Sequence, residues 1–292
     1  MADLRPSGPS LPAARSASPV SSHRLSAEQK AQYEERGYLT GMPPVFSSSQ
    51  VSDLNSGFTR LCDLLEEGED SKEIREWHES SLWLFDICRH EQILNYVEDV
   101  LGPDFYLWAS NYFAKEPNSP STVGWHQDGY YWPLSPHHSV TVWIACTDAD
   151  QGNGAMEVIP GTHKTGLIKH ERSNDTDSVL TLELEQGSVR TDAAVPICLK
   201  AGEISLHDDR LIHGSPGNPS DRPRVGLTVR YSGTQVKCDL SVNPHFRSYL
   251  MRGTDAFQHN PAGVVPSEAF GRVDRQHLSI EEAEQEQWHE RS

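Results

Sequence analysis

The segment Gly124-Trp125-His126-Gln127-Asp128-Gly129 places an imidazole and a carboxylate two residues apart. On a β-strand, side chains at positions i and i+2 point to the same face, so we expect His126 and Asp128 to project together. A neutral imidazole and a carboxylate are two thirds of the facial triad that holds non-haem Fe(II) and leaves other coordination positions open. Because a His-x-Asp pattern alone is common, a surface His–Asp contact on a turn is the alternative.

A second histidine for such a triad is His213, which follows the apolar pair Leu211-Ile212 and precedes a Gly-Ser-Pro turn. This position suits a metal ligand at the mouth of a β-barrel. His207 lies nearby in the sequence and competes for the same role. The strand-end position of His213 and its spacing to Arg224 favour His213.

Arg224 opens a run that we expect to form a strand through the core, Arg224–Tyr231. A buried guanidinium needs an anion, and it can hold a carboxylate with two parallel hydrogen bonds that lysine cannot reproduce. 2-Oxoglutarate supplies such a carboxylate.

The hydrophobic pattern predicts the elements that position these residues. Ser26 and Gln29 have the form of a capping box, and the helix that they open should stop at Gly37. Two further helices are predicted over about 48–65 and 91–101. After Pro103, short apolar or alternating runs separated by turn residues are typical of an antiparallel sandwich or barrel: 105–114, 140–147, 155–159, 203–206 and 225–231.

Composition limits the class of protein. The 292-residue chain has a formal net charge of −17, which disfavours general binding to nucleic acids or anionic membranes. No apolar run approaches the ~18 residues of a membrane helix, and we see no signal peptide. The five cysteines are scattered and form no Cys-x-x-Cys motif, which favours reduced thiols in a cytoplasmic protein.

These motifs, together with Gln151–Lys164 (QGNGAMEVIPGTHK), resemble the phytanoyl-CoA dioxygenase family of Fe(II)- and 2-oxoglutarate-dependent oxygenases over about residues 38–231. The resemblance implies a mainly β fold with flanking α-helices, a double-stranded β-helix (a cupin-like jelly roll). It implies that His126, Asp128 and His213 bind iron. It also implies that Arg224 binds the distal carboxylate of 2-oxoglutarate, with the Ser215 hydroxyl beside it.

The implied reaction uses Fe(II), 2-oxoglutarate and O2 and releases succinate and CO2. Related halogenases replace the carboxylate ligand with Gly or Ala, so the presence of Asp128 predicts hydroxylation. We expect residues 1–24 to be disordered and 25–292 to form one oxygenase domain. Its parts would be a helical region (about 25–103), a jelly-roll core (about 104–235) and a C-terminal extension (about 236–292), with a frayed helix at its end over 278–292.

Five further residues are candidates for the pocket. Asn111 and Thr141 could contact 2-oxoglutarate, and Lys115 could hold a substrate anion, although a solvated rim explains Lys115 equally well. Tyr130 and Trp132 follow the iron motif directly and are candidates for substrate binding, with core packing as the alternative.

Trp132 matches a pocket position in the related ectoine hydroxylases. With Trp108 and Trp83 it could form an aromatic wall for a cationic or ring-bearing substrate. His163 is expected to order its own turn, and the pair His137-His138 to lie on a surface loop. Arg252 could pair with Asp255, or Arg247 and Arg252 could bind a substrate anion.

We therefore expect a cytoplasmic hydroxylase of a small metabolite, such as an amino acid derivative or an amino- or ammonio-alkyl phosphonate. An acyl-CoA is disfavoured because the acidic chain offers little basic surface for nucleotide phosphates. The alternatives are a non-catalytic jelly-roll sensor and a metal-dependent cupin enzyme that does not use 2-oxoglutarate. The intact triad argues against the first, and Arg224 against the second. The sequence makes no prediction of oligomeric state.

Overall fold

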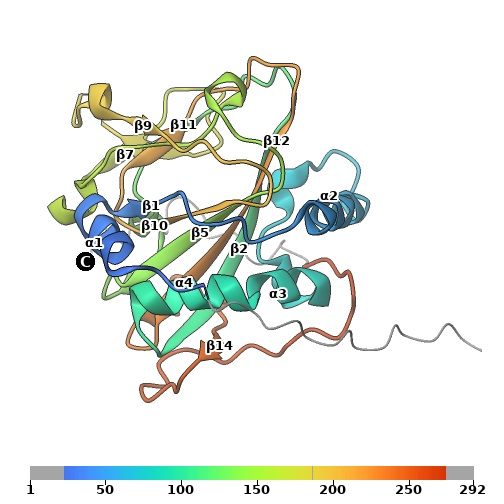
Figure 1. Ribbon diagram of the computed structural model, residues 1–292, viewed down its shortest axis with the longest axis vertical. Coiled ribbons are helices and arrows are strands. Elements are labelled where there is room, and N and C mark those ends of the chain that lie inside the picture. The colour runs from blue at the N-terminus through green and yellow to red at the C-terminus, as the bar shows by residue number, and fades with distance from the viewer. Residues whose placement is uncertain (1–22, 186, 274–292) are drawn as a thin grey trace, which may run out of the picture.

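The computed structural model describes residues 23–185 and 187–273, which are coloured in Figure 1. Of the segment predicted to be disordered (1–24), residues 1–22 lie outside this range, as does the predicted C-terminal helix over 278–292. For Arg24 the prediction was wrong, because its guanidinium pairs with Glu98 at 2.6 Å. In the described part of the chain, no helix is long and apolar enough to cross a membrane.

The helices lie mainly in the N-terminal third, as predicted. They are α1 (Ala27–Arg36), α2 (Ser48–Cys62), α3 (Leu82–Cys88), α4 (Glu91–Leu101) and the single turn α5 (Asp128–Tyr131). In α1 the Ser26 hydroxyl accepts the Gln29 N–H, the Gln29 side chain accepts the Ser26 N–H, and Gly37 ends the helix with φ 79°. The capping box is therefore confirmed. The short helix α3 was not predicted, because its residues are apolar on almost every side and show no helical periodicity.

Two antiparallel sheets form the β core. The larger has the strand order β1-β10-β5-β12-β2-β14, and the smaller has the order β3-β11-β6-β9. The strands of the larger sheet are β1 (Tyr38–Leu39), β10 (Ile204–Asp208), β5 (Ser139–Ala145), β12 (Arg224–Gly233), β2 (Phe105–Lys115) and β14 (Tyr249–Arg252). Those of the smaller are β3 (Val123–His126), β11 (His213–Ser215), β6 (Glu157–Val158) and β9 (Val195–Pro196). Two short antiparallel pairs accompany them: β4 (Leu134–Ser135) with β13 (Lys237–Cys238), and β7 (His170–Arg172) with β8 (Leu182–Leu184).

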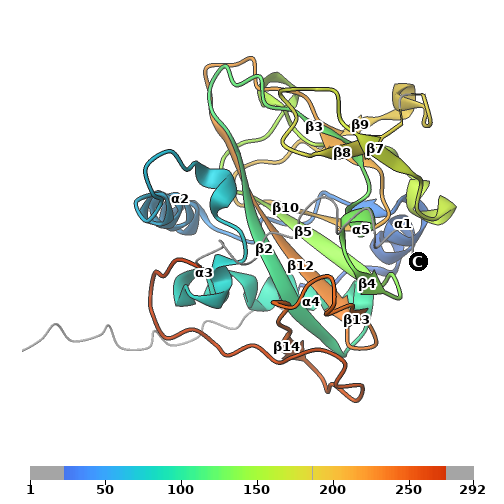
Figure 2. The ribbon, with the colours of Figure 1, turned by 180° about the vertical axis from the view of Figure 1, so that it is seen from behind.

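Helices α3 and α4 run along one face of the larger sheet, and the smaller sheet lies on its other side (Figures 1 and 2). This is the predicted mainly β, jelly-roll architecture with flanking helices, and the prediction is confirmed. The main core fills the space between the helices and the larger sheet. A second apolar cluster, which includes Trp143, Met156 and Leu211, packs between the two sheets.

Side-chain alternation along β5 and β12 decides which residues reach the space between the sheets. The residues that join the main core on the helix side are Val140, Val142, Ile144, Val225, Leu227 and Val229. The intervening positions therefore point towards the smaller sheet. They include Thr141 and Trp143 on β5, and Arg224 and Arg230 at the two ends of the β12 face.

Candidate metal centre

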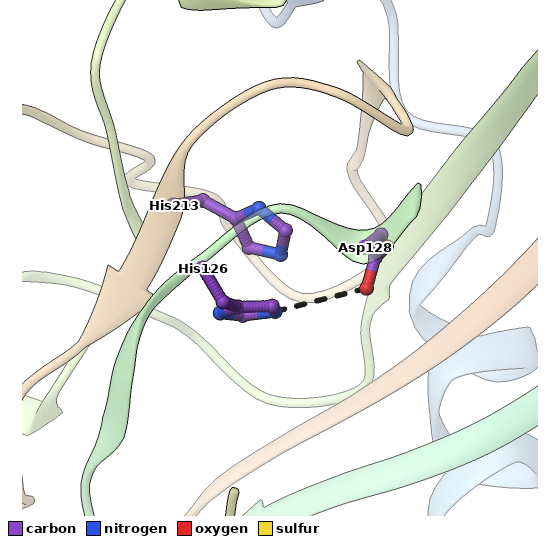
Figure 3. A group of neighbouring side chains, drawn as sticks. All are labelled: His126, Asp128 and His213. Atoms are coloured by element: carbon purple, nitrogen blue, oxygen red, sulfur yellow. Dashed lines mark ion pairs between the residues drawn. The ribbon is translucent and has the colours of Figure 1, made fainter. Parts of the chain in front are cut away.

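Three buried side chains form a compact group between the sheets: His126, Asp128 and His213 (Figure 3). One ligand atom of each lies within 4.8 Å of the others. His126 ends β3 and His213 begins β11, and the two are directly paired in the ladder, with ring centroids 4.1 Å apart. The structure thus brings together the three residues that the motifs singled out.

The carboxylate reaches this group by a different route from the one predicted. The strand β3 ends at His126, and Asp128 opens the helical turn α5, so the two residues do not share a strand. The Gly129 N–H donates to the Asp209 carbonyl oxygen at 2.6 Å, which holds this turn in place. The expectation of a common strand face was wrong, although the Asp128 carboxylate still lies 3.7 Å from His126 Nε2.

Backbone carbonyls fix the tautomer of both histidines. His126 Nδ1 lies 2.8 Å from the Gly124 oxygen, and His213 Nδ1 lies 2.9 Å from the Leu211 oxygen. Since a carbonyl only accepts, each Nδ1 carries the proton and each Nε2 has a free lone pair. Ligating histidines in metalloproteins are oriented by second hydrogen bonds of this kind. The donor set of two imidazoles and one carboxylate therefore fits Fe(II).

Protonation favours metal binding as well. Burial, together with the neighbouring His126 and His207 rings, holds the pKa of His213 well below its usual value, so that this imidazole is neutral. Burial alone would raise the pKa of Asp128, but Arg230, His126 and His207 together hold it well below its usual range. A neutral imidazole and an ionised carboxylate are the ligand forms that a metal ion requires.

Three side chains surround the Asp128 carboxylate. The Thr141 hydroxyl donates to its Oδ2 atom at 3.0 Å, Arg230 Nη2 lies 3.7 Å from Oδ1, and His207 Nε2 lies 3.5 Å from Oδ2. Thr141, a candidate for 2-oxoglutarate contact, thus has its hydroxyl committed to Asp128. His207, the rival of His213, lies behind the carboxylate on β10. Among the described residues, the group of three potential ligands contains His213 and not His207.

Arg224 and Ser215 lie beside the metal centre in the same cavity. Arg224 is only 2% exposed, and in the part of the chain that the structure describes its Nε atom and the Ser215 hydroxyl have no hydrogen-bond partner. The Arg224 guanidinium lies 5.7 Å from the ring centroid of Trp143, which lines this cavity too. Burial lowers the pKa of Arg224 to about 10, so it is cationic at neutral pH. Unpaired buried donors of this kind suit an anionic ligand.

A larger cavity of about 490 Å³ adjoins the metal centre and extends along β2. Its lining includes the candidates Asn111, Lys115 and Trp132. Lys115 is 3% exposed, so the alternative of a solvated rim was wrong for this residue. Trp132 packs edge-to-face on Trp108, with ring centroids 4.8 Å apart.

Two aromatic predictions differ from the structure. Tyr130 stacks on His170 with ring centroids 3.9 Å apart, whereas its neighbour Tyr131 lines the cavity and meets the His126 ring. Because these residues form a helical turn and not a strand, successive side chains are rotated by about 100°, and Tyr131 faces the cavity in place of Tyr130. Trp83 packs on Phe270 and does not join the wall of Trp108 and Trp132, because α3 lies on the helix side of the large sheet.

Arg230 lies in the site although it was not among the predicted site residues. Its guanidinium lies 5.0 Å from the Trp132 ring centroid, and its Nη1 donates to the Asn111 amide oxygen at 3.1 Å. Arg230 shares its face of β12 with Arg224, six residues earlier. The even spacing of two arginines on a strand was the signal that could have identified it.

The remaining candidates lie away from the metal. His163 Nε2 contacts the Glu34 carbonyl oxygen at 3.1 Å, consistent with a structural role. His137 is half-buried and lies 3.2 Å from Asp209, so it is not on an open loop surface. Arg252 pairs with Glu91 at 2.5 Å and also with Glu98, not with Asp255, and it therefore anchors β14 to α4. Arg247 donates to the Phe246 carbonyl oxygen at 2.7 Å.

Comparisons with known proteins identify a family model and several related sequences. A family model described as phytanoyl-CoA dioxygenase (PhyH) matches residues 33–226. The chain is 26% identical over 233 residues to the peroxisomal phytanoyl-CoA dioxygenase of Bos taurus, covering 71% of this chain and 68% of that one. It is 26% identical over 231 residues to a probable alpha-ketoglutarate-dependent hypophosphite dioxygenase of Stutzerimonas stutzeri (72% and 79% covered). It is 25% identical over 241 residues to an ectoine dioxygenase of Bordetella parapertussis (72% and 76% covered).

Solved structures share the fold. The apo form of the non-heme monooxygenase ThoJ superposes with a TM-score of 0.73 at 22% identity, covering 90% of this chain and all of that one. The epimerase SnoN in complex with Fe3+, alpha ketoglutarate and nogalamycin RO gives a TM-score of 0.62 at 18% identity, with 83% and 96% covered. These likenesses show that the chain shares the fold of these proteins.

Proposed function

Because the chain belongs to the phytanoyl-CoA dioxygenase family, we propose that it hydroxylates a small metabolite that carries an acidic group. The enzyme is an Fe(II)- and 2-oxoglutarate-dependent dioxygenase that acts on a small molecule. An amino acid derivative or an amino- or ammonio-alkyl phosphonate is our preferred substrate, ahead of an acyl-CoA. One observation carries the proposal: the His126–Asp128–His213 group lies beside the buried Arg224 guanidinium, whose Nε atom has no hydrogen-bond partner among the described residues.

Each residue of the site has a role in this proposal. His126, Asp128 and His213 would hold Fe(II). When bound, the iron would allow O2 to oxidise the substrate while 2-oxoglutarate is converted to succinate and CO2. Thr141 orients the Asp128 carboxylate through its hydroxyl hydrogen bond. Arg224 would bind the distal carboxylate of 2-oxoglutarate in two parallel hydrogen bonds, with the Ser215 hydroxyl as a further donor.

The balance of charge supports an acidic substrate. The positive charge of Fe(II), Arg224 and Arg230 together is larger than the negative charge of Asp128 and a bound 2-oxoglutarate together. The loaded site thus keeps net positive charge although the whole chain is strongly acidic. Arg230 faces the larger cavity, where it could bind a carboxylate or phosphonate of the substrate.

An amino or ammonio group on the substrate would suit the aromatic part of the same cavity. Trp108, Trp132 and Tyr131 all line it, and aromatic faces attract cations. A cavity of about 490 Å³ accommodates a small zwitterion within the protein. We therefore place the acidic end of the substrate near Arg230 and its amino end near the tryptophans.

The test is succinate formation by the Fe(II)-loaded enzyme with 2-oxoglutarate and O2 across a panel of metabolites. The panel contains amino acid derivatives, aminoalkyl phosphonates, their N-methylated forms and acyl-CoA thioesters. We expect stimulation by a small acid and a raised KM for that acid in Arg230→Met, with iron content measured as the control. Stimulation by acyl-CoA alone would overturn the substrate class. If no compound stimulated succinate formation, the non-catalytic sensor would be favoured.

A further inference from the structure

Two buried cationic side chains face each other across a pair of strands. Arg224 opens β12, Lys115 ends β2, and the ladder pairs their Cα atoms directly. Side chains in that relation lie on one face with Cβ atoms about 4.5–5.5 Å apart. Arg224 is 2% and Lys115 is 3% exposed. Among the described residues, no carboxylate pairs with either, and the pKa of Lys115 is affected by burial and by Arg224 alone.

The hydrogen bonds of Lys115 match an uncharged amine. Its Nζ atom lies 3.3 Å from the Ser215 carbonyl oxygen and 2.5 Å from that of Pro216. A neutral amine has two N–H groups for these two acceptors, whereas an ammonium has three donors. The third would have no acceptor here until an anion entered the space next to Arg224 and the Ser215 hydroxyl.

Electrostatics agree with this geometry. Burial and the charge of Arg224 together lower the pKa of Lys115 to about 7, so the amine is largely neutral at pH 8. Arg224 stays charged at that pH. A carboxylate placed beside Arg224 would oppose both effects, because it neutralises the guanidinium and attracts a proton to the amine.

We propose that Lys115 and Arg224 form one carboxylate site, in which Arg224 supplies a permanent charge and the Lys115 amine takes up a proton when 2-oxoglutarate binds. This inference rests on the proposed function, since it takes 2-oxoglutarate as the ligand of Arg224. It assigns Lys115 to the co-substrate, where the sequence suggested the substrate. Lys115 acts here by adjusting the charge of the site and not as an acid or base in the reaction.

Other charged groups share the cavity that Lys115 lines. They come from the segment between α2 and α3, from β12 and from the metal centre: Lys72, Glu73, Arg75, Glu76, Arg224, Arg230, His126 and Asp128. The Asn218 amide also donates to the Lys115 carbonyl oxygen at 3.3 Å. Lys200 provides a matched control, because it is exposed, pairs with Asp148 at 2.8 Å and does not line this cavity.

The inference predicts how affinity depends on pH. Below about pH 7 Lys115 is already protonated, and 2-oxoglutarate affinity should not change with pH. Above pH 7 the proton must be taken up on binding, so affinity should fall by up to about tenfold per pH unit. A lysine that merely holds the backbone at Ser215 and Pro216 would produce no such dependence.

The test is anaerobic calorimetry of 2-oxoglutarate binding to the Fe(II)-loaded protein, at pH 8 in phosphate and in Tris, whose ionisation enthalpies differ. The wild type should take up nearly one proton per 2-oxoglutarate. Lys115→Gln should take up almost none and bind about tenfold more weakly than wild type at pH 6.5. Lys115→Arg, which keeps a fixed charge, should bind without proton uptake. Lys200→Gln should behave like the wild type.

Three results decide the matter. Binding without proton uptake by the wild type at pH 8 overturns the inference, and this needs no variant to fold. Unchanged uptake in both Lys115→Gln and Lys115→Arg also overturns it, because another group must then accept the proton. A wild-type protein that binds no 2-oxoglutarate at any pH overturns the proposed function instead.

Discussion

Replacing Arg224 by alanine should weaken 2-oxoglutarate binding by at least about a hundredfold. The guanidinium is 2% exposed, so water replaces its hydrogen bonds poorly once the side chain is removed. Charge-assisted hydrogen bonds contribute about 1.5–3 kcal/mol each, and two such bonds are available to one carboxylate. Since about 1.4 kcal/mol corresponds to tenfold in affinity, losing both exceeds a hundredfold even at the lower limit.

Arg224→Lys should recover only part of the affinity, because an ammonium keeps the charge but lacks the planar pair of donors. The assay is anaerobic titration of the Fe(II) protein with 2-oxoglutarate, followed calorimetrically, with iron content measured alongside. Arg222→Ala is the matched control: this arginine is exposed, pairs with Asp150 at 3.0 Å and should bind 2-oxoglutarate as the wild type does. An Arg224→Ala variant with wild-type affinity would refute the assignment.

Other changes have equally definite outcomes. His126→Ala, Asp128→Ala and His213→Ala should each lose bound iron and turnover while melting near the wild-type temperature; a variant that kept both iron and turnover would remove that residue from the ligand set. Asp128→Gly should lower hydroxylation sharply and weaken iron binding, and unchanged product formation would contradict the role of Asp128. Gly226→Ala should destabilise the fold by about 1–3 kcal/mol and lower 2-oxoglutarate affinity, because a Cβ there would meet the Trp143 ring at 2.0 Å; denaturant unfolding and calorimetry measure both. Burial raises the pKa of Asp209 to about 6, so the folded state holds this proton more tightly than the unfolded chain and stability falls as pH rises from about 4 to 6. Asp209→Asn should therefore gain more stability relative to wild type at pH 7.5 than at pH 4.5, and equal gains at both pH values in thermal melts would contradict this.

The metal centre could be predicted from the sequence because a His-x-Asp motif followed by a distant histidine and an arginine is an uncommon combination. His126, Asp128 and His213 lie together in the structure although 84 residues lie between Asp128 and His213 in the sequence. Short-range pattern also located α1 and α4 and the main strands, because capping residues and alternation act over a few neighbouring positions.

What the sequence missed depends on contacts between distant segments. Asp128 lies on a helical turn that is held by a hydrogen bond from the Gly129 N–H to the Asp209 carbonyl oxygen. These two residues are 80 positions apart in the sequence. Trp83 was assigned to the pocket because aromatic type does not reveal which face of a sheet a helix covers. The burial of Lys115 opposite Arg224 arises from the register of β2 and β12, which no local pattern specifies.

The most direct test of the central claim is oxygen-dependent conversion of 2-oxoglutarate to succinate by the purified protein. The account predicts that the wild type forms succinate only when Fe(II), 2-oxoglutarate and O2 are all present, that a small acidic metabolite accelerates it, and that His213→Ala forms none. Succinate formation by His213→Ala at the wild-type rate, or none by the iron-loaded wild type with any metabolite of the panel, would contradict it.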